Sequence, residues 1–176
     1  FYFQPREVKA QAAMYKGEIY FAKDSFELAL KGNGADFVGF EAIADDYSST
    51  KAGNLAAAYA GICYYNLGKD AEALAYLKKF DGDDAFLSPN IEAMIGNCYA
   101  NMDQYDDAIK AFEKAAKKAD NEMASPIFFQ AATVAEKMGN YKKALDFYQK
   151  IKDEYSQSMI GRDIDKYIER AKAHVK

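Results

Sequence analysis

Residues 52–80 read AGNLAAAYAGICYYNLGKDAEALAYLKKF. The stretch predicts two helices joined by a tight turn at Leu67-Gly68-Lys69-Asp70, where Gly and Asp separate two runs rich in Ala and Leu. The same pattern recurs before and after it. We therefore expect a chain built from copies of one helical hairpin.

Two series of residues repeat at fixed distances. Gly61 and Gly96 are 35 residues apart, and each is followed three residues later by Tyr, as is Gly17. An Ala followed by an aliphatic residue recurs in the second helices, with steps of 44, 35 and 36, at Ala29, Ala73, Ala108 and Ala144. Small residues let two helices approach closely, and a ring one turn later fills the space between hairpins. A period in the mid-thirties is typical of a helical solenoid.

The chain resembles the tetratricopeptide repeat (TPR) family. The likeness is carried by Gly61-x-x-Tyr64…Gly68…Ala73-Leu74, Gly96-x-x-Tyr99…Tyr105-x-x-Ala108-Ile109-x-x-Phe112-x-x-Ala115 and Gly139-x-Tyr141-x-x-Ala144-Leu145-x-x-Tyr148. It departs from the family pattern in lacking Trp and in having Ala132 and Ala135 in the first helix of the fourth unit. The resemblance implies an all-α, right-handed TPR superhelix (α-solenoid) of about four helical hairpins plus a C-terminal capping helix.

We expect a single TPR domain over residues 1–176. Its repeats are predicted at about 6–47, 51–80, 88–118 and 125–154, and its capping helix at about 158–174. The capping helix is predicted to direct five apolar residues inward, namely Ile160, Ile164, Tyr167, Ile168 and Ala171. Its other side is predicted to face solvent with Arg162, Asp163, Lys166, Glu169, Arg170 and Lys172.

The first hairpin is interrupted. Its first helix is expected over about 6–22, with four inward candidates, Ala12, Ala13, Ile19 and Tyr20. The second helix begins at Ser25, is broken by Lys31-Gly32-Asn33-Gly34, and is expected to resume over about 35–46. The break explains the 44-residue step. It is either a harmless insertion at the end of a solenoid or a loop that contacts a partner.

Polar residues mark the expected starts of later helices. Ser48-Ser49-Thr50 supplies an N-cap for the helix that follows. Ser88-Pro89 and Ser125-Pro126 are predicted to open the next two repeats, with Ser as the capping residue and Pro at the first helical position.

The composition excludes several classes of function. The net charge is −4 with mixed signs, and no basic patch with interleaved rings indicates nucleic-acid binding.

Cys63 and Cys98 occupy equivalent places in consecutive repeats, where stacked helices lie roughly 8–10 Å apart. A disulfide needs Cα atoms within about 7 Å, so we predict two free, buried thiols.

No pattern typical of an enzyme is present. The only histidine, His174, lies close to the end of the sequence, and no Ser, Thr or Cys has a histidine beside it that could activate it. Metal-binding spacings are absent as well. We therefore predict a non-catalytic protein that needs no cofactor and no metal.

The remaining candidate is the concave TPR surface, lined by the first helix of each hairpin. Counting from each small residue, the candidate partner-binding positions are Met14, Glu18, Phe21, Ala58, Ile62, Tyr65, Asn66, Ala93, Asn97, Asn101, Phe129, Thr133 and Glu136. Asn97 and Asn101 share one helix face and either hydrogen-bond a peptide backbone or merely face water. The TPR proteins that grip carboxylate tails carry basic residues here. Because this chain has Met14, Glu18, Asn90 and Met94 at those places, that function is disfavoured.

A second resemblance concerns the first hairpin and the helix after it. Three segments are similar to the YfgM-like, membrane-anchored envelope TPR proteins of Bacteroidetes-type bacteria: Phe37-Val38-Gly39-Phe40, Ile43-Ala44-Asp45-Asp46-Tyr47-Ser48 and Lys51-Ala52-Gly53-Asn54-Leu55-Ala56. The resemblance implies a protein or peptide partner, including translocon or envelope proteins, and a place in the bacterial cell envelope on the periplasmic side of the inner membrane. Otherwise the protein is expected to be cytoplasmic.

The first four residues, 1–4, are uncharged and mostly aromatic. They are the end of a membrane helix, a tag remnant, or an apolar end that docks on the first helix. The alternative function is a self-associating scaffold, a homodimer joined through Phe1–Phe3 and the concave surface.

Overall fold

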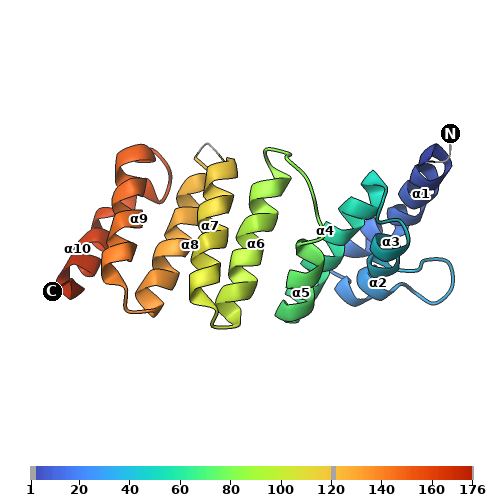
Figure 1. The fold of residues 1–176 in the computed structure, drawn as a ribbon, viewed down its shortest axis with the longest axis horizontal. Helices are drawn as coiled ribbons and strands as arrows, with labels where there is room; N and C mark the ends of the chain where they lie inside the picture. The colour runs from blue at the N-terminus through green and yellow to red at the C-terminus, as the bar shows by residue number, and fades with distance from the viewer. Residues whose placement is uncertain (1–2, 120–121, 176) are drawn as a thin grey trace. The chain divides into compact units, whose positions relative to one another are not determined.

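The computed structural model describes residues 3–119 and 122–175, and all regular structure within these ranges is helical (Figure 1). The chain forms two compact units, residues 1–81 and 82–176. Unit 1 contains α1 (Phe3–Phe21), α2 (Phe26–Lys31), α3 (Phe40–Asp46), α4 (Lys51–Asn66) and α5 (Asp70–Leu77). Unit 2 contains α6 (Leu87–Asn101), α7 (Tyr105–Ala119), α8 (Ala124–Lys137), α9 (Tyr141–Glu154), the short 3₁₀ helix η1 (Gly161–Asp163) and α10 (Asp165–His174).

Each unit is made of helical hairpins, as the sequence predicts. In unit 1, α4 packs on α5, and α1 packs on α2 and α4. In unit 2, α6 packs on α7, α7 on α8, α8 on α9, and α9 on α10. The all-α class and the hairpin repeat are thereby confirmed, while the single domain over residues 1–176 stays a prediction. None of the helices within the described ranges is both long and apolar enough to cross a membrane.

The four hairpin turns share one backbone geometry. A residue two or three positions after the end of each first helix has a positive φ, between 54° and 74°, at Asp24, Gly68, Asp103 and Gly139. These positions follow the same steps as the Ala series. In each turn the next N–H reaches back five residues, for example from Lys69 to the Tyr64 carbonyl at 2.9 Å. Each turn is therefore a Schellman motif, which satisfies the last carbonyls of the helix and fixes the angle of the hairpin.

The repeated glycines are points of close helix contact. A methyl group added at Gly61 would lie 2.6 Å from Leu77 Cδ2, and one at Gly96 would lie 2.7 Å from Phe112 Cε1. Both partners come sixteen residues later, on the second helix of the same hairpin. The small residue thus accepts a large apolar side chain, as the spacing predicts.

The insertion in the first hairpin is an ordered loop. The Asn33 side-chain oxygen accepts hydrogen bonds from the backbone N–H groups of Ala35, Asp36 and Phe37, each at 3.1 Å. A methyl group on Gly17 would lie 2.6 Å from the Phe37 ring. The loop therefore places the Phe37 ring against Gly17, where the small residue leaves room for it. The prediction of a helix from residue 35 is wrong, because these residues are held around Asn33 and α3 begins only at Phe40.

The same junction motif precedes α4 and η1. Thr50 Oγ1 donates to the Tyr47 carbonyl at 2.7 Å and accepts from Gly53 N–H at 2.9 Å. Ser158 makes the same pair of hydrogen bonds, at 2.7 and 2.9 Å, with the residues at the equivalent places, Tyr155 and Gly161. The pattern Tyr-Ser-x-(Ser/Thr)-x-x-Gly thus connects α3 to α4 and α9 to η1, and the predicted N-cap at Thr50 is confirmed.

The predicted N-caps of α6 and α8 are wrong. Both helices begin one residue before the serine, at Leu87 and Ala124. Ser88 instead donates to the Gly82 carbonyl at 2.7 Å, and Ser125 bonds to the Ser158 hydroxyl at 2.8 Å. Each serine side chain therefore hydrogen-bonds to a residue outside its helix and does not cap the helix N-terminus.

The C-terminal helix covers the end of unit 2. Ile164, Ile168 and Ala171 are buried in a core that includes Phe112, Phe128 and Tyr148, and the predicted charged residues are exposed. The predicted faces are confirmed. The predicted start at residue 158 is wrong, because the chain makes a turn at Ser158 and a 3₁₀ helix before α10 begins at Asp165.

Burial around α1 also departs from expectation. Ala13 and Tyr20 are half-buried, but Ala12 is exposed and Ile19 is 38% exposed. The prediction that Ala12 and Ile19 face inward is wrong, since the buried positions of α1 are Ala10, Met14 and Gly17. The predictions about Phe1 and Tyr2, and about the side chains of Phe3 and Gln4, concern groups outside what the structure describes.

Candidate functional site

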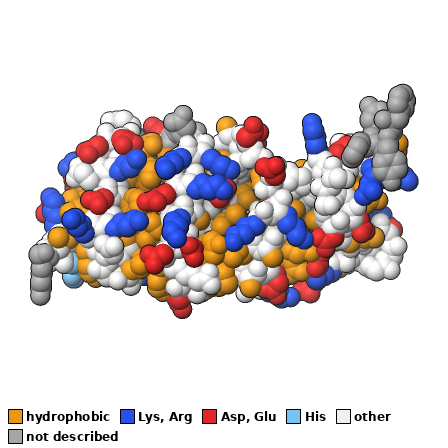
Figure 2. All heavy atoms as spheres, viewed as in Figure 1, with side chains coloured by type: hydrophobic (Ala, Val, Ile, Leu, Met, Phe, Trp, Pro, Cys, Tyr) orange, Lys and Arg blue, Asp and Glu red, His pale blue; other side chains and the backbone are white. Residues whose placement is uncertain are grey.

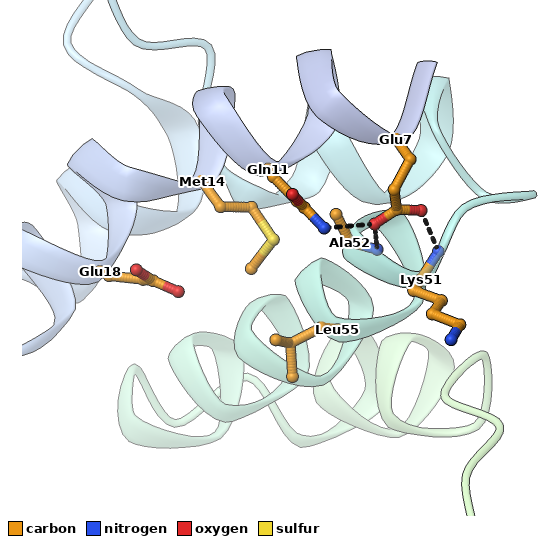
Figure 3. Close-up of a pocket in the computed structure, with 7 residues that line it drawn as sticks. All are labelled: Glu7, Gln11, Met14, Glu18, Lys51, Ala52 and Leu55. Carbon is orange, nitrogen blue, oxygen red and sulfur yellow. Dashed lines mark hydrogen bonds between the residues drawn. The ribbon is translucent and has the colours of Figure 1, made fainter. Parts of the chain in front are cut away.

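Two first helices of unit 1, α1 and α4, form the walls of a pocket of about 230 Å³ (Figure 3). Its lining residues are Glu7, Gln11, Met14, Glu18, Lys51, Ala52 and Leu55. Figure 3 shows Met14 from α1 and Leu55 from α4 projecting into the space between the two helices. The floor of the pocket is therefore apolar, with polar side chains at its ends.

Glu7 joins the two walls. Its carboxylate accepts hydrogen bonds from the backbone N–H groups of Lys51 at 2.8 Å and Ala52 at 3.0 Å, and from Gln11 Nε2 at 3.1 Å (Figure 3). The first N–H groups of a helix have no partner within the helix and carry partial positive charge. A carboxylate from α1 thus caps α4 and fixes the width of the pocket.

Glu18 lies at the other end of the pocket and is exposed. Its carboxylate forms no ion pair with any cation in the part of the chain that the structure describes. Burial raises the pKa of the nearby Tyr59 phenol, and the negative charge of Glu18 adds to the shift. Glu18 is therefore a carboxylate next to an apolar surface and available to a cation from outside.

The structure brings only some of the predicted unit 1 residues to this pocket. Met14 and Glu18 line it, whereas Ile62 and Tyr65 lie further along α4 and are half-buried. Asn66 is exposed, but its amide donates to the Ile62 carbonyl at 2.8 Å.

Three predicted positions are less exposed than expected. Met14 and Ala58 are only 4% and 1% exposed, so the expectation that their side chains face outward is wrong. Residues three before each small position turn toward the neighbouring helix. Phe21 packs edge-on against Tyr59 at 4.9 Å and against Phe26 at 5.6 Å, which makes it part of the contact between α1 and α4.

The predicted positions of unit 2 differ in their exposure. On α6, Ala93 is buried in the core, which corrects its expected exposure, while Asn97 is half-buried and Asn101 is exposed. On α8, the exposed Thr133 donates its hydroxyl hydrogen to the Phe129 carbonyl at 2.9 Å.

The capping helix covers part of α8. The Phe129 ring meets Tyr167 edge-on at 4.7 Å and lies 5.7 Å from Tyr148. Glu136 pairs with Arg170 of α10 at 2.7 Å. Both predicted positions are therefore occupied by contacts within the chain, because α10 lies where another first helix would continue the stack.

Sequence reasoning missed the other five lining residues, Glu7, Gln11, Lys51, Ala52 and Leu55. The signal was present, since residues 7, 11, 14 and 18 follow the four-three spacing of one helix face. The cap that Glu7 provides has no local signal, because its partners lie 44 and 45 residues away.

The two cysteines are free and buried, as predicted. Burial raises the pKa of the Cys63 thiol to about 12. Such a thiol stays protonated and unreactive near neutral pH. Among the residues whose placement is described, no group of three His, Cys, Asp or Glu side chains could hold a metal ion.

Comparisons with known proteins identify the repeats. One sequence model of the tetratricopeptide repeat matches residues 93–122, and another matches residues 59–81 and 127–158. The chain therefore contains tetratricopeptide repeats. No curated protein sequence matches it significantly.

Two crystal structures of the protein MamA are similar in fold. One shares 18% sequence identity with a TM-score of 0.67, covering 94% of this chain and 87% of that one. The other shares 19% identity with a TM-score of 0.60, covering 90% of this chain and 93% of that one. At this identity the likeness concerns the fold, and it agrees with an α-solenoid.

Proposed function

We propose that the chain is a non-catalytic protein–protein interaction scaffold that binds an extended segment or helix of another protein between α1 and α4. Tetratricopeptide repeats support this proposal, since helical repeats offer surfaces formed by successive hairpins. The observation that carries it is the pocket of unit 1, which has an apolar floor at Met14 and Leu55 and, at Glu18, a carboxylate that pairs with no cation among the described residues.

The pocket favours a definite kind of ligand. Met14 and Leu55 would receive one apolar side chain, and a methionine wall adapts to different shapes. Glu18 would pair with a Lys or Arg of the partner. Glu7 is already bound to the α4 N-terminus and holds the pocket open rather than meeting the ligand.

In-cell photo-crosslinking tests the proposal. A photoreactive residue at Lys51, on the pocket rim, is expected to capture another protein, whereas one at the exposed Lys142 on α9 is expected to capture much less. Leu55→Glu should abolish the capture, because it places a charge on the apolar floor.

Leu28→Glu is the matched control, since it makes the same chemical change at a leucine of unit 1 that is already 43% exposed and does not line the pocket. Capture that survives Leu55→Glu, or crosslinks that join only copies of this chain, would contradict the proposal.

We propose further that the domain is the soluble part of a membrane-anchored protein on the periplasmic side of the bacterial inner membrane. The support is the resemblance of residues 37–56 to envelope TPR proteins, which also favours translocon or envelope proteins as partners. Protease treatment of spheroplasts made from cells that express the full-length protein tests this. Digestion of the domain is expected, and protection until the membrane is broken would refute the location.

A further inference from the structure

Helix α1 is apolar on two opposite sides. One side packs into unit 1 through Ala10, Met14 and Gly17, which are buried. The opposite side carries five apolar residues, here called the outer stripe: Val8, Ala12, Tyr15, Ile19 and Ala22, of which Ala22 directly follows the last residue of the helix.

The outer stripe is exposed in the structure. The exposed fractions are 64% at Val8, 66% at Tyr15 and 38% at Ile19. A surface helix normally places charged and polar residues on the side opposite the core, and a helix that is apolar all round is normally buried. Unit 2 shows the normal arrangement, with Lys and acidic side chains interspersed where α7 and α9 lie (Figure 2). The outer stripe thus has the character of a surface covered by another helix.

The spacing of the stripe is that of a coiled-coil seam. Its five residues are separated by four, three, four and three positions. In heptad notation Ala12 and Ile19 occupy a positions, and the other three residues occupy d positions. A period of 3.5 keeps a narrow seam turned toward one partner helix.

The residues beside the seam show which helix fits. Lys9, Lys16 and Lys23 follow the d positions at seven-residue intervals, and Gln11 and Glu18 precede the a positions. In a parallel pair these two flanks meet across the interface, so that Glu18 approaches Lys23 of the partner, which lies in the turn two residues after the end of α1. An antiparallel pair would instead place the lysine flanks against each other. Lys16 is already paired with Asp36 of its own chain.

We propose that the outer stripe is a self-association surface, on which the α1 helices of two copies of the chain pack in parallel. The charge pattern above selects the second copy as the occupant. The outward residues of α10, including Lys166 and Glu169, are charged, so the α10 helix offers no apolar face on which α1 of another copy could stack. The seam spans about two heptads, so the dimer is weak and depends on concentration.

The first test is sedimentation velocity over a range of concentrations, using residues 1–176. The wild type is expected to shift from monomer to dimer, and Tyr15→Glu to remain monomeric. Val38→Glu is the matched control, because it introduces the same charge at an apolar residue of unit 1 that is 58% exposed and lies outside the stripe. A wild type that stays monomeric at every concentration would overturn the proposal, as would a dimer that Tyr15→Glu leaves intact.

The second test detects the parallel arrangement by disulfide crosslinking. In a parallel pair, position 12 faces itself within disulfide range, so Ala12→Cys should form a covalent dimer under mild oxidation. The native Cys63 and Cys98 are buried, and Ala35→Cys, on the exposed loop, reports crosslinking by random collision. Equal trapping at positions 12 and 35 would refute the parallel seam.

A lipid surface is the competing occupant, since a basic flank beside an apolar stripe also suits anionic membranes. The stripe contains two alanines and no large aliphatic residue except Ile19, which favours a helix over a bilayer. Vesicles of phosphatidylcholine and phosphatidylglycerol are therefore expected not to co-sediment with the protein. Binding that Tyr15→Glu abolishes, together with a wild type that remains monomeric, would overturn the proposal in favour of a membrane surface.

Discussion

Replacing Gly53 by alanine is expected to destabilise unit 1 strongly. The new methyl carbon would lie 1.9 Å from the Tyr47 carbonyl oxygen, where ordinary contact begins at 3.4 Å. The oxygen would have to retreat by about 1.5 Å. It accepts hydrogen bonds from Thr50 N at 2.8 Å and from Thr50 Oγ1 at 2.7 Å, and Gly53 N–H bonds to the same hydroxyl. The substitution therefore disturbs three hydrogen bonds at once.

The expected decrease in the free energy of unfolding follows from these hydrogen bonds. Each hydrogen bond contributes about 1 kcal/mol to the free energy of unfolding. The higher helix propensity of alanine returns at most about 1 kcal/mol. The expected net loss is about 2–3 kcal/mol. It can be measured by urea denaturation followed by far-ultraviolet circular dichroism, with the folded wild type as reference.

A double-mutant cycle separates this mechanism from a general effect of added bulk. Thr50→Ala alone should cost about 1–2 kcal/mol. Combined with Gly53→Ala it should cost less than the sum, because both changes break the same junction. Gly161→Ala should reproduce the effect in unit 2, since its methyl carbon would lie 2.1 Å from the Tyr155 carbonyl oxygen. A loss below about 0.5 kcal/mol for Gly53→Ala, or full additivity with Thr50→Ala, would refute the reasoning.

Three further predictions follow from buried polar groups. Ser158→Ala should lower the free energy of unfolding by about 1–2 kcal/mol, because it removes hydrogen bonds to Tyr155, Gly161 and Ser125; Ser156→Ala, at an exposed serine, is the control for the urea measurement. Cys63 should react with a thiol reagent only on unfolding, because burial raises its pKa to about 12, and reaction of the native protein as fast as in urea would contradict its burial. Burial also raises the pKa of Tyr148 to about 12, against about 10 in the unfolded chain. Because the folded state holds this proton more tightly, the phenol contributes to the free energy of unfolding below pH 10, and this contribution is lost as the pH rises toward 12. The urea midpoint of Tyr148→Phe should therefore fall less than the wild-type midpoint across that range.

Much of the fold could be predicted from the sequence because the hairpins are local. The steps of 44, 35 and 36 in the Ala series reappear in the positive-φ residues of the four turns. Gly61 and Gly96, predicted as close contacts, do contact the second helix, since residues sixteen apart meet in any hairpin of this length. Of the residues that line the candidate pocket, only Met14 and Glu18 were predicted from the sequence.

The remaining features depend on groups far apart in the chain. Glu7 caps α4 across 44 residues, α10 covers Phe129 and Glu136, and the loop at Asn33 carries Phe37 onto Gly17. The orientation of α1 belongs here too, because a helix that is apolar on both sides has no periodicity that selects its core side. The sequence alone thus determined the all-α class and the hairpin period, since these arise from the 3.6-residue repeat and from local turns. Only the tertiary structure decided which apolar side of each helix is covered, because that depends on which distant segment packs against it.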